Sequence, residues 1–212
     1  MANGGLNGGE FLRAGCGSLA RSGELDFLAR VGADGLPRRL GVMGGTFDPI
    51  HNGHLEIARR ACESLDLSGV LFVVAGDPWM KHGRALTSAE DRFAMVQAAI
   101  EGDDRFAASR MEIDRAGETY TVDTLRALRA ALPASVELCF LMGADAAVRL
   151  GEWREASELG SLARFAVVSQ RGDAARRIPR AFRCCAAGDW PPHVRRGRHV
   201  RFGYGGVRGR YH

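Results

Sequence analysis

Lysine is nearly absent from this sequence: only one of its 29 basic residues, Lys81, is a lysine. Long apolar runs are absent too, and none approaches the roughly 20 residues that a membrane-spanning helix needs. The first residues lack the basic start and the apolar segment of a secretion signal. We therefore expect a cytoplasmic protein. Lys81 is conspicuous because the other Lys and Arg positions are all arginine.

Cysteines with the spacing of metal ligands are also missing. The five cysteines are scattered, odd in number and without a C-x-x-C pair, at positions 16, 62, 139, 184 and 185. Such a set supports neither a disulfide framework nor a zinc site. We expect free thiols.

The positive charge of the chain is concentrated at its end. From Gly172 onward ten arginines stand against two aspartates, whereas the preceding residues carry a net negative charge. Affinity for nucleic acid would therefore belong to this segment alone. We keep nucleic-acid binding there as a minor alternative, because basic low-complexity tails are commonly just solvated.

The apolar pattern divides the chain into three parts. Residues 1–38 are rich in Gly, Ala and Arg, and their one apolar stretch, at residues 25–31, is short, so we expect a disordered extension. Residues 39–169 alternate apolar runs of strand length with helical patterns and form the expected domain. Residues 170–212 are dominated by Gly, Pro and Arg, and we assign them no structure.

The middle part predicts an α/β fold. Strands buried on both faces are expected at residues 39–43, 70–75, 136–142 and 165–169, with helices between them. This alternation is typical of a Rossmann-like parallel sheet with helices on both faces. Such sheets bind ligands outside the carboxyl ends of their strands, so a site is expected at that edge.

One helix start is marked by a capping box. The Thr87 hydroxyl can accept a hydrogen bond from the Glu90 backbone N–H. The Glu90 side chain can in turn accept one from the Thr87 backbone N–H. We expect Glu90 and Arg92 on the surface of this helix. Its buried stripe would consist of Phe93, Val96 and Ile100.

Residues 44–54, G-G-T-F-D-P-I-H-N-G-H, combine several features of a phosphate site. The glycines allow a sharp turn that brings backbone N–H groups close to an anion, and the helix that follows adds its positive end. His51 and His54 stand where that helix begins and can both reach one phosphate, whose developing charge their hydrogen bonds would stabilise. A lone glycine pair or histidine would be weak support, but eleven consecutive residues fit a single site.

The same stretch, continued by Leu55, resembles the signature of bacterial nicotinate-nucleotide adenylyltransferases, which belong to the nucleotidyltransferase superfamily. Further stretches resemble this family in the same order, at residues 76–81, 112–115, 119–125, 143–145 and 164–169, together with Trp153. The resemblance covers about residues 39–169.

The resemblance implies that the phosphate of nicotinate mononucleotide attacks the α-phosphorus of ATP, in the presence of Mg²⁺ and without a covalent enzyme intermediate. Deamido-NAD and pyrophosphate are the products. His51 and His54 would hold and stabilise the ATP phosphates. The other residues implied on the ATP side are Gly44, Gly45, Thr46, Phe47, Lys81, Gly143 and Asp145. Those implied near the pyridine ring are Tyr120, Thr121 and the stacking Trp153.

The chain departs from the family after Ser169. A second motif of the family, resembling I-S-S-T-x-I-R, has no counterpart there. One hypothesis is a slip of the reading frame near Gln170, which sequencing of the locus would test. Two alternative functions stay open: a relative that binds nucleotide without turnover, and an adenylyltransferase with another phosphate-ester acceptor such as phosphopantetheine. Residues 119–125 and Trp153 argue against the second.

Overall fold

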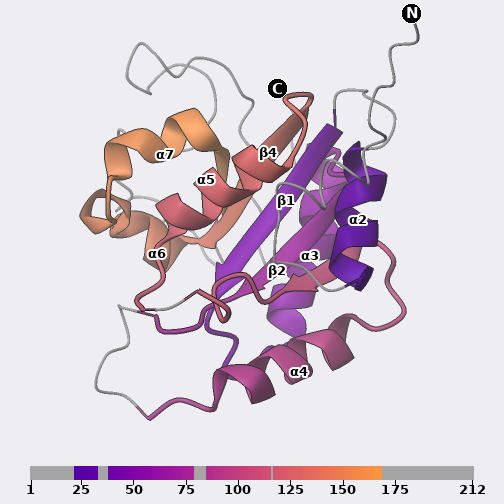
Figure 1. Cartoon of the computed structure of the whole chain (residues 1–212), viewed down its shortest axis with the longest axis vertical. Helices are drawn as coiled ribbons and strands as arrows, with labels where there is room; N and C mark the ends of the chain where they lie inside the picture. The colour runs from indigo at the N-terminus through magenta and orange to yellow at the C-terminus, as the bar shows by residue number, and fades with distance from the viewer. Residues whose placement is uncertain (1–21, 33–37, 79–84, 116, 169–212) are drawn as a thin grey trace, which may run out of the picture.

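A computed structural model describes residues 22–32, 38–78, 85–115 and 117–168 of the chain. Its centre is a parallel sheet with the strand order β3-β2-β1-β4-β5. Figure 1 labels β1, β2 and β4 of this sheet. The strands are β1 (Arg38–Gly45), β2 (Gly69–Val74), β3 (Phe106–Ser109), β4 (Val136–Gly143) and β5 (Arg164–Val168). The strand order reverses between β1 and β4, which is where such sheets open a crevice for ligands.

The strands confirm the predicted parallel sheet. β2 is buried along its whole length, as its unbroken apolar run indicated. Met43 of β1 lies opposite Phe72 of β2, and Val42 lies opposite Phe140 of β4. β3 was not predicted, because its sequence Phe-Ala-Ala-Ser has a weak strand pattern; pairing with β2 places it in the sheet.

Helices cover both faces of the sheet, as predicted. They are α2 (Ser22–Gly32), α3 (Asn52–Leu65), α4 (Ala89–Ile100), α5 (Thr121–Ala131), α6 (Ala144–Val148) and α7 (Ala156–Leu162), with a 3₁₀ turn at Leu150–Glu152. The apolar sides of α3 and α4 pack on one face, around Phe72 and Leu141. Those of α2, α5 and α7 pack on the other face, around Leu71 and Phe140.

α2 corrects the expectation of a disordered extension for Ser22–Gly32. Phe27, Leu28 and Val31 are buried in the core. Leu71 and Ala107 lie on the face of the sheet that α3 and α4 do not cover. α2 packs on this face and buries these side chains. The apolar stretch is too short for a core of its own, yet it is sufficient to complete this one. Residues 170–212, for which we assigned no structure, lie outside the described part.

The start of α4 differs from the prediction by one residue. The N-cap is Ser88, whose hydroxyl accepts from the Asp91 N–H at 3.1 Å. Thr87 instead donates its backbone N–H to the Asp48 carboxylate at 3.1 Å, which connects the two loops. The predicted stripe is confirmed, with Phe93 and Val96 buried and Ile100 partly buried.

Two further expectations concern cysteines and membranes. The expectation of thiols outside a disulfide is confirmed for Cys62 and Cys139, the cysteines within the described residues, and both are buried. Of the helices described, none is long and apolar enough to span a membrane.

Candidate active site

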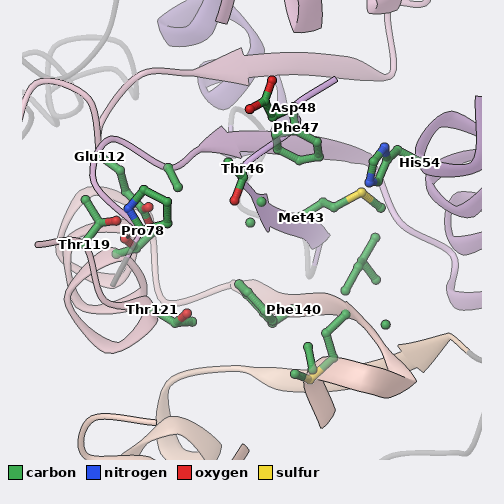
Figure 2. Close-up of a pocket in the computed structure, with 18 of the residues that line it drawn as sticks. Met43, Thr46, Phe47, Asp48, His54, Pro78, Glu112, Thr119, Thr121 and Phe140 are labelled. Carbon is green, nitrogen blue, oxygen red and sulfur yellow. Dashed lines mark hydrogen bonds between the residues drawn. The ribbon is translucent and has the colours of Figure 1, made fainter. Parts of the chain in front are cut away.

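A cavity of about 610 Å³ opens at the carboxyl ends of β1 and β4. Figure 2 shows His54 and Glu112 on opposite sides of it, with Thr46 and Phe140 between them. Ten of the twelve predicted site residues line this one cavity: Gly44, Gly45, Thr46, Phe47, His51, His54, Tyr120, Thr121, Gly143 and Trp153. Asp145 lies in the first turn of α6, two residues after Gly143. Lys81 lies outside the described residues.

The glycine pair shapes the loop that follows β1. A Cβ on Gly45 would lie 2.9 Å from Cζ of Phe47, and one on Gly44 would lie 3.2 Å from Cζ of Phe140. Phe47 itself adopts a left-handed conformation with φ of 49°. Its buried ring packs edge-on against His54, with the centroids 5.2 Å apart. The loop therefore turns tightly and keeps its backbone at the cavity.

His51 and His54 form a compact pair at the start of α3. Their rings stack with centroids 3.8 Å apart. The His54 N–H donates to the His51 carbonyl at 2.9 Å, and the His51 N–H donates to Nδ1 of His54 at 3.3 Å. Because a backbone N–H can only donate, Nδ1 of His54 is the acceptor. The ring proton of neutral His54 therefore lies on Nε2.

The environment keeps the His54 ring neutral. Burial lowers the pKa of His54 to about 4, and the neighbouring His51 adds to this effect. Near pH 7 the side chain is therefore an uncharged hydrogen-bond donor at the cavity. Such a donor can bind a phosphate oxygen without contributing a formal charge.

The opposite wall presents aromatic rings. Trp153 packs edge-on against Phe140, with centroids 6.0 Å apart. The Arg154 guanidinium lies 4.7 Å from the centroid of the Tyr120 ring. Within the described part of the chain, the buried Nε1–H of Trp153 has no hydrogen-bond partner. This wall offers flat apolar surface, a cation and a polar donor that a ligand can satisfy.

Glu112 lines the same cavity. From the sequence we named only the stretch at residues 112–115 and did not identify Glu112 as a site residue. It is 8% exposed and accepts from the Thr124 hydroxyl at 2.5 Å. Burial raises the pKa of this carboxyl, and the hydrogen bond from Thr124 opposes the rise. The sequence lacks a local signal for this contact, because Thr124 lies on the next helix.

The placement of Arg92 on the helix surface was wrong. Arg92 is 2% exposed and donates to four backbone carbonyls around the site. The signal was its spacing, because it lies four residues before Val96 and eight before Ile100, on the buried stripe. Glu90 was placed correctly, since its side chain is 63% exposed and pairs with Arg110 at 2.6 Å.

The doubly wound sheet and the glycine-histidine cavity at its switch point define a Rossmann-like α/β protein with a cavity suited to an anionic ligand. Residues 42–195 match the model of the cytidylyltransferase-like family. The chain belongs to this family.

Named relatives agree with the resemblance drawn from the motifs. The chain is 53% identical over 135 residues to a probable nicotinate-nucleotide adenylyltransferase of Mycolicibacterium vanbaalenii, covering 64% of this chain and 63% of that protein. A protein of the same name from Corynebacterium kroppenstedtii is 50% identical over 134 residues, which cover 63% of each chain. The chain thus matches less than two thirds of the length of these relatives.

The solved structures support the fold. The nicotinic acid mononucleotide adenylyltransferase of Plasmodium falciparum, complexed with NaAD, aligns with a TM-score of 0.58 at 15% identity, over 81% of this chain and 77% of that one. Its complex with APC aligns over the same shares with a TM-score of 0.57.

Proposed function

We propose that this protein transfers the AMP part of ATP to nicotinate mononucleotide and forms deamido-NAD and pyrophosphate. The observation that carries the proposal is one cavity that joins the glycine-histidine loop to the aromatic wall at Tyr120 and Trp153. The names of the relatives at about 50% identity support the same activity.

In this reaction a phosphate oxygen of the mononucleotide forms a bond to the α-phosphorus, and the bond from that phosphorus to pyrophosphate breaks. The chain contributes no nucleophile to the step, so its residues act by position and charge. The Nε2–H of His54 donates to a phosphate oxygen, and this bond strengthens as negative charge builds there. His51, which stacks on His54 and lines the same cavity, would reach the same group.

Mg²⁺ would be carried chiefly by the nucleotide. Among the described residues, no group of three or more His, Cys, Asp or Glu side chains could hold a metal ion. Mg²⁺ does not require such a group, because it keeps several waters and is usually bound through substrate phosphates and one or two carboxylates. When bound, the ion neutralises phosphate charge. Asp48, which lines the cavity, is the carboxylate nearest to the glycine loop in sequence.

The acceptor would occupy the aromatic wall. Trp153 and Tyr120 offer surface to a pyridine ring, and α5 begins at Thr121 with backbone N–H groups that lack partners within the helix. Arg154 and the helix start both favour a negatively charged substituent on that ring. This wall therefore fits nicotinate better than it fits the acceptor phosphopantetheine, which has no aromatic ring at its phosphate ester.

Pyrophosphate release from ATP, Mg²⁺ and nicotinate mononucleotide tests the proposal. We expect His54→Ala to lower the rate by about two orders of magnitude, because it removes a donor to the developing charge. Glu63→Ala is the matched control, since it changes an exposed residue near the other end of α3. Equal rates for His54→Ala and the control would remove His54 from the mechanism.

A second candidate is a relative that binds nucleotide without turnover. It is favoured by the lack of an I-S-S-T-x-I-R counterpart after Ser169. ATP binding by a folded chain that releases no pyrophosphate with any phosphate-ester acceptor would establish it. Release with phosphopantetheine but not with the mononucleotide would instead change the acceptor.

The location proposed for this activity is the cytoplasm, where ATP is abundant. Fractionation of cells that express the full chain would test it.

A further inference from the structure

We infer that Arg92 is a positioning residue that holds the glycine loop and the end of β2 in the geometry that binds ATP phosphates. The inference rests on the proposed function of the same cavity. The inference goes beyond that function because it assigns a role to Arg92, a residue of α4 that does not line the cavity itself.

The contacts of Arg92 join three segments. Nη1 donates to the carbonyls of Thr46 and Ala75, both at 2.7 Å. Nη2 donates to the Gly76 carbonyl at 3.1 Å, and Nε donates to the Thr87 carbonyl at 2.9 Å. A planar guanidinium with its donors in a fixed fork can satisfy four carbonyls at once, whereas an ammonium with three donors cannot.

These contacts also set the direction of backbone N–H groups. In a trans peptide the C=O and the following N–H point to opposite sides. Since the Thr46 carbonyl points at Arg92, the Phe47 N–H points away from it. Thr46 and Phe47 line the cavity and Arg92 does not, which is the arrangement expected if this N–H faces the phosphates. Arg92 thus selects the peptide orientation that an anion requires.

Asp48 adds a second connection between the glycine loop and the residues before α4. Its carboxylate accepts from the Thr87 N–H at 3.1 Å, while the carbonyl of the same Thr87 accepts from Arg92. The charge of Asp48 also favours the buried guanidinium, whose pKa is lowered by burial. The loop at residues 46–48 and the start of α4 are therefore held together from both sides.

Arg129 provides a matched control on the other side of the molecule. It donates from Nε to the Leu162 carbonyl at 2.8 Å and from Nη1 to the Val136 carbonyl at 2.6 Å. Val136 is the first residue of β4, so it lies at the end of this strand that is away from the cavity. Arg129→Lys therefore tests loss of an arginine–carbonyl cluster that does not support the site.

The experiment compares Arg92→Lys with Arg129→Lys in the full chain, with ATP binding measured by calorimetry and the melting temperature measured alongside. We expect both variants to melt earlier, but only Arg92→Lys to bind ATP about tenfold more weakly. In turnover its KM for ATP should rise, while its KM for nicotinate mononucleotide stays within about twofold of the wild-type value. Equal ATP affinities for the two variants would overturn the inference.

The wild-type chain supplies a test that does not depend on the folding of a variant. On saturation with ATP, the amide resonance of Phe47 should shift and its hydrogen exchange should slow. An unchanged Phe47 amide would contradict the inference even if Arg92→Lys does not fold.

The proposed function can fail separately. A wild-type chain that binds ATP but releases no pyrophosphate refutes turnover, and the comparison of ATP affinities still decides the role of Arg92. Normal turnover with equal affinities in the two variants refutes the role of Arg92 alone. A wild-type chain that does not bind ATP refutes both.

Discussion

His54 couples the site to the stability of the fold. Its pKa in the folded chain is about 4, below the ordinary value of 6.5, because of burial and then the nearby His51. Between these two values the unfolded chain binds the proton more readily, so this residue destabilises the fold as the pH falls from 6.5 toward 4. Its contribution is fully present above pH 6.5. Discounted for partial exposure, the loss is on the order of 1 kcal/mol.

We therefore expect His54→Gln to lose less stability than the wild type when the pH falls from 6.5 to 4. Urea unfolding at several pH values measures this difference, and a histidine titration by NMR measures the pKa directly. In His51→Gln the pKa of His54 should rise part of the way, since burial, the larger cause, remains. A His54 pKa near 6.5 in the wild type would contradict this account.

α2 carries another titrating group with a shifted pKa, the buried Glu24. Glu24 is 8% exposed, and burial raises its pKa to about 7, with a further rise from Asp114 and an opposing effect of the hydrogen bond with Ser109. The folded chain therefore retains this proton between pH 4.5 and 7, where the unfolded chain has lost it. Stability from this residue is present below pH 4.5 and falls as the pH rises through 7.

Glu24→Gln should accordingly be more stable than the wild type at pH 8, by about 2 kcal/mol, and nearly equal to it at pH 4.5. Asp26→Asn is the control, because Asp26 is an exposed carboxylate of the same helix. Denaturant unfolding at both pH values provides the comparison. A gain that does not depend on pH would show that the removed charge is not the cause. Glu24 and His54 act in opposite directions in the wild type, so only differences between variants separate them.

For the whole molecule, ligand binding and stability are linked. A ligand at one hundred times its Kd stabilises the folded state by about 2.7 kcal/mol. In a chain of this size this corresponds to a rise in Tm of about 5–10 °C. We expect ATP to cause such a rise, and CTP at the same concentration to cause a smaller one. Equal shifts with the two nucleotides would show that the cavity does not select adenine, which would weaken the adenylyltransferase proposal.

Local patterns predicted the parallel sheet apart from β3, and the motifs named ten residues that line the cavity. The apolar run of β2 requires cover on both faces, so its burial could be read without a structure. Residues 44–54 are contiguous, and their glycines and helix start come together at one cavity through contacts within a few residues, so a phosphate site could be proposed there from the sequence. The contributions of Tyr120, Thr121 and Trp153 were placed by resemblance, and the fold brings them to the same cavity.

Other features depended on contacts between distant segments. Arg92 is 46 residues from Thr46, and Glu112 meets a hydroxyl 12 residues away. A charged residue is normally solvated unless the fold supplies partners, so its burial is decided by tertiary structure. α2 is a similar case, because Leu28 becomes buried only when the sheet offers an uncovered apolar face. The sequence by itself determined which local units form and where phosphate chemistry is possible. Only the tertiary structure decided which charges are buried and which helix completes the core, because burial depends on partners that are remote along the chain.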